Sequence, residues 1–209
     1  AIAATASYSQ VRMRVSPRGL RRFATGATAL TVASVIGAWT LLSVRSRIGN
    51  AHELGIFDAA WGIGSAFTAI LIGVSQSTLL PKWVTQQHRL VHALPLFGIA
   101  ALMVAGLALL RTYLVPLFYS TEYNLASSLM RLTLAGDFLK LVSWTLSLPL
   151  IADRAWGRFL ACELLAWGTF WYVPTVSPGT SSERAAIGYT ACYLIHALAC
   201  LAVRTWRWR

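Results

Sequence analysis

Apolar residues gather in six long runs along the chain, separated by short segments rich in charged residues, proline and glycine. Each run has about 18–28 residues, and about 20 are needed for a helix to cross a bilayer. The pattern therefore predicts an all-α membrane protein with six transmembrane helices. The expected spans are residues 20–44, 55–80, 94–117, 125–152, 159–176 and 185–203.

Composition supports this fold class. Of the 209 residues, 56% are hydrophobic and 12% are charged, whereas a soluble domain has about 25% charged residues. No polar stretch is long enough to form a separate soluble domain. We expect a basic, flexible connector at residues 1–16, a six-span transmembrane lobe at 17–204 and a basic cytoplasmic tail at 205–209.

The net charge of +11 is distributed unevenly between the two sides of the predicted membrane protein. Lysine and arginine are enriched in loops on the cytoplasmic side, so the richer side is predicted to be cytoplasmic and to hold both termini. The basic residues lie between apolar runs, where anionic lipid headgroups are better partners than nucleic acid. The richer side holds Arg12, Arg14, Arg18, Arg21, Arg22, Lys82, Arg89, Arg154, Arg158, Arg204, Arg207 and Arg209; the other holds Arg45, Arg47, Arg111, Arg131 and Arg184.

Small residues form ridges on the first two spans. Such ridges let helix backbones approach closely in lipid, so the first is interpreted as a helix-packing surface. The first ridge contains Gly26, Ala29, Ala33 and Gly37, and the second contains Gly62, Ala66, Ala69, Gly73 and Ser77.

The run 132–144, LTLAGDFLKLVSW, places an acid and a base near the middle of a predicted span. Asp137 and Lys140 are three residues apart, so in a helix they project from the same face. A charge at the bilayer centre costs about 2.5–3.5 kcal/mol on insertion scales and usually faces a bundle interior or a wet cavity. The pair is interpreted either as an internal salt bridge or as a group that handles substrate or protons.

Three further charges lie within or near predicted spans. Asp58 is expected in the first turns of the second span, where the helix dipole favours a carboxylate, or alternatively in a cavity. Arg111 is expected to reach the headgroups, or to face an anionic substrate. Arg131 lies toward one end of the fourth span.

The last two spans carry other groups that can titrate. Glu163 is expected to pair with Arg154 or Arg158, and His196 to be packed as a hydrogen-bonded neutral side chain. The three cysteines, Cys162, Cys192 and Cys200, lie in apolar runs and show no ligand spacing, so they are expected to be small buried side chains.

No catalytic constellation is found. The chain lacks GxSxG, HExxH and GxxxxGK[ST]. The acids in the predicted loops, Glu53, Glu122, Asp153 and Glu183, are scattered on both sides. We therefore expect a protein that is not an enzyme and that uses neither a metal nor another cofactor.

Three stretches, residues 55–83, 109–144 and 185–204, together resemble the C-terminal half of Wzx-type polysaccharide flippases. These belong to the multidrug/oligosaccharidyl-lipid/polysaccharide exporter superfamily, and the likeness is closest to the O-antigen and enterobacterial common antigen (lipid III) translocases. GDFLKLVSW is the most specific element, followed by the pattern from GIFDAAW to LLPKW.

The resemblance implies one lobe of a two-lobe exporter in the bacterial inner membrane. Its substrate would be an undecaprenyl-pyrophosphate-linked oligosaccharide, flipped to the periplasmic leaflet by alternating access for lipopolysaccharide or exopolysaccharide biosynthesis. The pyrophosphate would be bound by Lys140, with Arg111 or Arg131, and Asp137 and Asp58 are candidates for ion coupling. The partners implied are membrane lipids, a first lobe in the same or another chain, and polysaccharide polymerase machinery.

Two other readings remain open at this point. The chain could be a non-transport scaffold subunit of a polysaccharide assembly complex, which would tolerate neutral replacements of Asp137 and Lys140. A membrane-embedded transferase or protease would instead turn over its substrate in detergent.

Overall fold

The computed structural model describes residues 17–85 and 90–206. The predicted connector, 1–16, and the end of the predicted tail, 207–209, lie outside them. The described residues form six α-helices and two short 3₁₀ helices with no strand, which confirms the all-α fold. The α-helices are α1 (Pro17–Ser46), α2 (Ala51–Thr85), α3 (Leu94–Phe118), α4 (Ala126–Ala152), α5 (Trp156–Val176) and α6 (Ser181–Trp206); η1 (Leu90–Ala93) precedes α3 and η2 (Thr121–Tyr123) precedes α4.

Five of these helices are long and apolar enough to cross a membrane: Ala24–Ser46, Ala51–Trp83, Val91–Phe118, Ala126–Ala152 and Ser181–Arg204. The chain therefore has the character of a multi-pass membrane protein. The fifth helix, α5, has sufficient length with 21 residues but is not among the five. Its sequence contains Arg158, Glu163 and three tryptophans, which lower its hydropathy.

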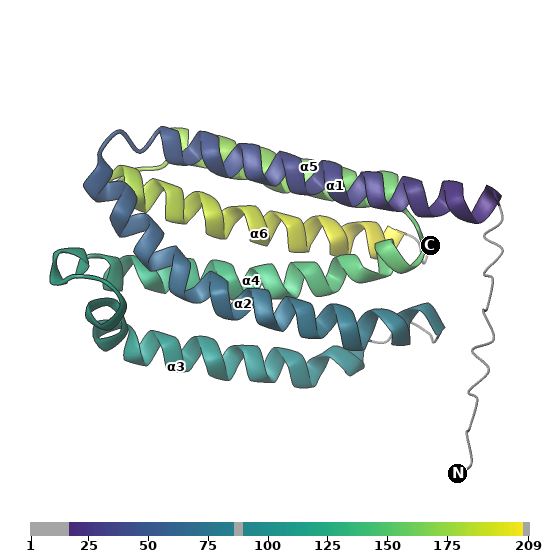
Figure 1. The fold of residues 1–209 in the computed structure, drawn as a ribbon, viewed down its shortest axis with the longest axis horizontal. Coiled ribbons are helices and arrows are strands. Elements are labelled where there is room, and N and C mark those ends of the chain that lie inside the picture. Colours follow the sequence, from purple (N-terminus) through teal and green to yellow (C-terminus); the bar gives the residue numbers. More distant parts are fainter. Residues whose placement is uncertain (1–16, 86–89, 207–209) are drawn as a thin grey trace, which may run out of the picture.

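The helices run roughly alongside one another, and α1 begins at the end of the bundle where α6 ends (Figure 1). The central helix is α4, which packs against α2, α3 and α6 and has 61% of its most apolar stretch buried. On the far side, α6 packs against α5, and α5 packs against α1. Because α1 rests mainly on α5, space is left between α1 and the central helices.

The helix ends have clear local causes. Asn50 begins α2: its side-chain oxygen accepts from the backbone N–H of His52 at 2.9 Å, and its carbonyl accepts from Leu54 at 3.0 Å. Thr180 and Glu183 begin α6 as a capping box, in which each side chain accepts a hydrogen bond from the other residue's N–H. Gly179, just before it, has φ +107°, a conformation that glycine adopts without strain.

The first small-residue ridge is a packing surface, as predicted. A Cβ at Gly26 would lie 2.7 Å from the ring of Trp156, and one at Gly37 would lie 2.7 Å from Trp167. The glycines thus let α1 lie directly on the tryptophans of α5. The second ridge differs: Gly62 is half-buried, but Ala66, Ala69, Gly73 and Ser77 are exposed on α2.

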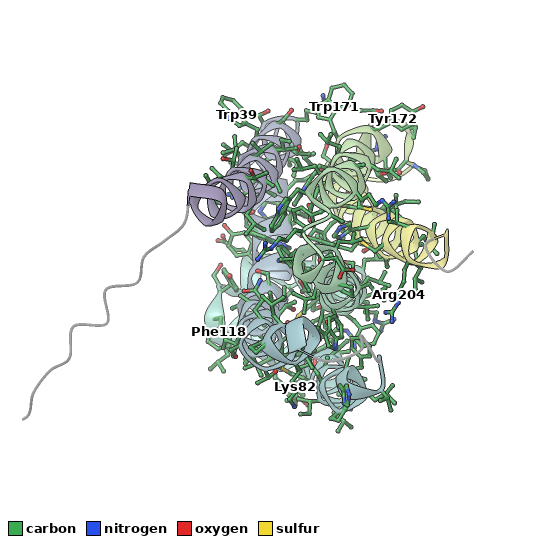
Figure 2. The ribbon with its side chains drawn as sticks, turned by 90° about the vertical axis from the view of Figure 1, so that its right-hand side faces the viewer. Trp39, Lys82, Phe118, Trp171, Tyr172 and Arg204 are labelled. Carbon is green, nitrogen blue, oxygen red and sulfur yellow. The ribbon has the colours of Figure 1, made fainter. Side chains whose placement is uncertain are left out.

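Large apolar and aromatic side chains cover the outside of the bundle, as expected for a surface in contact with lipid acyl chains. Figure 2 shows Trp39, Trp171 and Phe118 at the periphery. Trp39 is 68% exposed and Phe118 is 64% exposed. The helix with most buried polar side chains is α4, which contributes Thr133, Asp137, Ser143, Thr145 and Ser147.

Candidate functional site: an aromatic cavity with buried charges

A cavity of about 310 Å³ lies between α1 and the helices α2, α4, α5 and α6. Its α1 wall is formed by small and aliphatic residues, including Ala33, Gly37 and Leu41. Two charged side chains line it, Lys140 from α4 and Glu163 from α5. The aromatic lining consists of Trp61, Trp144, Phe159, Trp167, Phe170, Tyr189 and Tyr193.

The aromatic side chains form a connected set. Tyr189 and Tyr193 lie one turn apart on α6, with ring centroids 5.1 Å apart in an edge-to-face arrangement. Trp61 approaches Tyr189 from α2, and Trp167 approaches Tyr193 from α5, with centroid separations of 6.4 and 6.2 Å. Such pairs are favourable at these distances and hold the lining in a defined geometry.

Lys140 lies within this aromatic set. Its Nζ is 5.7 Å from the centroid of the Tyr193 ring, close enough for a cation–π interaction. Among the described residues, no ion pair within 4.0 Å joins Lys140 to Asp137. The lysine therefore presents its charge to the cavity.

Asp137 has a different environment on the same helix. It is 1% exposed, and its Oδ1 accepts a hydrogen bond of 2.6 Å from the hydroxyl of Tyr189. Its Oδ2 has no hydrogen-bond partner and lies so close to Gly64 of α2 that a Cβ there would overlap it. The expectation that Asp137 and Lys140 face the bundle interior is confirmed, but only Lys140 lines the cavity.

Polar contacts across helix interfaces hold α4 in this position. Thr133 donates to the carbonyl of Ala60 on α2 at 2.9 Å, and Thr190 of α6 donates to the carbonyl of Leu132 at 2.8 Å. Hydrogen bonds of this kind between membrane helices contribute about 0.6 kcal/mol on average. They fix the register in which Asp137 meets both Gly64 and Tyr189.

Glu163 faces the bundle interior, and the expected pairing with Arg154 or Arg158 is wrong. Its Oε2 accepts a hydrogen bond of 2.9 Å from Nε1 of Trp167, one turn along α5. Its Oε1 lies 3.5 Å from Nε2 of His196 on α6, while both arginines are exposed. Apolar residues surround Glu163 along the sequence of α5. The sequence therefore does not show which helix the glutamate side chain faces.

His196 is buried as expected, but its Nε2 has no hydrogen-bond partner. All three cysteines are buried and free, which confirms their interpretation. No group of three or more His, Cys, Asp or Glu residues that could hold a metal ion occurs in the part of the chain that the structure describes.

The other predicted site residues lie away from this cavity. Asp58 forms an ion pair of 2.5 Å with Arg45 across the α1–α2 turn and lies about two turns inside α2, which begins at Ala51. Arg111 is half-buried and donates to the carbonyl of Ala108 one turn earlier. Arg131 is exposed on α4.

Sequence reasoning missed the aromatic lining and the contact of Glu163 with His196. One signal was present: Trp61, Trp144 and Trp167 lie well inside their helices, whereas tryptophan in membrane proteins is enriched near the ends of spans. Their position indicates an internal role, but not which helices meet there.

The arrangement can bind a ligand that has both a charged group and apolar faces. Lysine binds phosphate as a point charge, and aromatic rings stack against the apolar faces of sugar rings. The volume is near the lower end of that of ligand pockets, about 300–1,000 Å³. A cavity of this size takes only part of a lipid-linked oligosaccharide.

Comparisons of the chain with protein-family models, with curated proteins and with solved structures find no match.

Proposed function

We propose that this chain is one lobe of a Wzx-type flippase for undecaprenyl-pyrophosphate-linked oligosaccharides in the bacterial inner membrane. The observation that carries the proposal is the cavity, because it combines a lysine with an aromatic lining in the middle of an apolar bundle. Lys140 binds the pyrophosphate, and the aromatic rings contact the sugar nearest to it.

We further propose that α5 is the sixth span, which brings both termini to the cytoplasmic side. Its length matches the other helices, and it lies along α1 in the bundle (Figure 1). Leu164 and Leu165 are exposed on its outer face, whereas Glu163 and Trp167 line the cavity. Its low hydropathy therefore comes partly from residues that face inward rather than toward lipid.

A first lobe, in the same polypeptide or a partner chain, completes the transport path and provides alternating access. Arg111 and Arg131 do not line the cavity of this lobe, so a pyrophosphate role for them requires a surface shared with the other lobe. Asp137 and Asp58 remain candidates for ion coupling on the strength of their position within spans.

Substrate binding by the reconstituted chain tests the proposal. Undecaprenyl-pyrophosphate-linked oligosaccharide is titrated onto the chain in nanodiscs, and binding is followed by tryptophan fluorescence, since Trp61, Trp144 and Trp167 line the cavity. Lys140→Ala should weaken binding about ten-fold or more, because hydrogen bonds to charged groups contribute about 1.5–3 kcal/mol. Arg158→Ala, an exposed charge outside the cavity, is the matched control and should leave the affinity unchanged.

The outcomes separate the candidate functions. No saturable binding, or equal affinity in wild type and Lys140→Ala, contradicts the flippase proposal and favours the scaffold reading. Binding that depends on Lys140, followed by transfer of the oligosaccharide between leaflets once both lobes are present, supports it. Undecaprenyl pyrophosphate that bears no sugar measures the contribution of the aromatic lining separately.

A further inference from the structure

We infer that Glu163 and His196 form a proton-binding site in the wall of the cavity. The two side chains meet between α5 and α6, with Oε1 of Glu163 and Nε2 of His196 3.5 Å apart. Glu163 lines the cavity, whereas His196 does not and lies behind it. A proton that enters from the cavity therefore reaches the carboxylate of Glu163, which holds it against the imidazole of His196.

The facing atoms are buried and unsatisfied. Glu163 is 5% exposed and His196 is 1% exposed, and neither Oε1 nor Nε2 has a hydrogen-bond partner. Leaving a buried polar atom without a partner costs about 1–3 kcal/mol. At 3.5 Å the two atoms are farther apart than in an ordinary hydrogen bond, so a small approach of α5 to α6 would complete one through a shared proton.

The surroundings leave a proton as the ligand that fits. The groups around the pair that can titrate are Lys140 from α4, Cys162 from α5, and Cys192, Tyr193 and Cys200 from α6. The α1 wall of the cavity contributes Ser34 and otherwise apolar residues. Within residues 17–85 and 90–206, no group of three or more His, Cys, Asp or Glu side chains is arranged to hold a metal ion.

Protonation of the site involves one proton and the side chains of Glu163 and His196. A proton from cavity water binds Oε1 of Glu163 and converts the carboxylate to a carboxylic acid. The proton stays on the carboxyl, whose O–H donates a hydrogen bond to Nε2 of the neutral His196 as the two side chains approach. Glu163 keeps its hydrogen bond from Trp167 throughout, because that bond uses the other oxygen.

Charge balance connects this site with Lys140. With one proton the pair is neutral overall, and with none it carries one negative charge, which Lys140 can compensate across the cavity. An anion bound at Lys140 removes that compensation and favours proton uptake by the pair. This connection rests on the proposed function, whereas the proton site itself does not.

Infrared spectroscopy of the whole chain in nanodiscs tests the site without any substrate. Protonated carboxyl groups have a carbonyl stretch that ionised ones lack, so a pH titration should show a buried glutamate carboxyl that gains and loses a proton reversibly. Glu163→Gln should abolish this band, while its amide oxygen still accepts from Trp167. His196→Gln should move the midpoint of the band by about one pH unit, because it replaces the imidazole that accepts a hydrogen bond from the protonated carboxyl.

Two controls assign the infrared band to Glu163. Asp137→Asn removes the other buried carboxyl of the bundle interior, and the part of the band that belongs to Glu163 should remain in this variant. Isotope labelling of glutamate alone should shift the band in the unaltered chain, which assigns it to a glutamate even where a variant fails to fold. A glutamate-labelled band that survives Glu163→Gln, a midpoint of that band unchanged by His196→Gln, or a Glu163 carboxyl that never titrates while the chain stays folded overturns the inference.

Inorganic pyrophosphate then tests the connection with Lys140. Its addition should increase the protonated fraction of Glu163 in wild type and have no effect in Lys140→Ala. An unchanged titration in wild type overturns the connection and weakens the proposed function, while the substrate-free result still stands for the proton site.

Discussion

Asp137 on α4 and Glu163 on α5 are both buried acids, but they are held in opposite ways. Asp137 is enclosed between α2, α4 and α6, with one oxygen bonded to Tyr189 and the other against Gly64. Glu163 stands in a cavity wall, with one oxygen bonded to Trp167 and the other facing His196 across 3.5 Å. The first is positioned by packing, whereas the second has space on one side and a partner that can exchange a proton.

This difference shows what an acid in an apolar run does and does not reveal. Burying the charge makes a partner necessary in both cases. The surroundings then decide how mobile the carboxylate is. The Tyr189 hydroxyl and the backbone of Gly64 fix Asp137, whereas Glu163 has His196 and a cavity beside it and is expected to bind a proton. The following predictions measure how far the two sites differ.

The largest effect is expected at Gly64. A Cβ at this position overlaps Oδ2 of Asp137 and lies 3.0 Å from Leu134, so Gly64→Ala should lower the free energy of unfolding by about 2 kcal/mol, as overpacking of a core does. Denaturant titration of the chain in detergent measures the loss. Gly73→Ala is the matched control in the same helix, because a Cβ there meets nothing within 4 Å.

A second substitution tests the cause of that loss. Adding Asp137→Ala to Gly64→Ala removes the overlapping carboxylate, so the double variant should lose less than the sum of the two single losses. Strict additivity would mean that Gly64 is needed for another reason, and the tight enclosure of Asp137 would have to be abandoned.

A smaller loss is expected from Tyr189→Phe. It removes the donor to Oδ1 of Asp137 and leaves both oxygens without a partner, which should cost about 1.5 kcal/mol of unfolding free energy. The same denaturant titration measures it. Tyr193→Phe, one turn away on α6, keeps the ring beneath Lys140 and should cost less; equal losses would show that the bond to Asp137 has no special weight.

The helices could be predicted from the sequence, because runs of about 20 apolar residues are a strong signal. Even so, α2 begins at Ala51 instead of residue 55, since Asn50 supplies a cap that an apolar pattern does not register. The inward direction of Asp137 and Lys140 was also predictable, because charges in the middle of a span avoid lipid.

The composition of the site could not be predicted in the same way. Helical periodicity tells which residues share a face, but not which helix lies opposite that face. Glu163 was assigned to nearby arginines because they are close in sequence, while its actual neighbour, His196, is contributed by another helix. The tryptophans of the cavity likewise come from three helices, and only their packing brings them together.

The smallest effect is expected at Trp167, because Glu163 has a cavity beside it. Trp167→Phe removes the hydrogen bond to Oε2 and should cost about 1 kcal/mol of unfolding free energy, a typical net value for one hydrogen bond. The carboxylate can then turn toward cavity water, a route that is closed to Asp137 because Gly64 and Tyr189 surround it. Denaturant titration measures the loss, and Trp144→Phe is the control. It removes the same ring area from a cavity residue of another helix, so the difference between the two variants gives the contribution of the hydrogen bond. A loss at Trp167 as large as that of Tyr189→Phe would mean that Glu163 is held as tightly as Asp137, and the contrast between an enclosed and a responsive acid would fail.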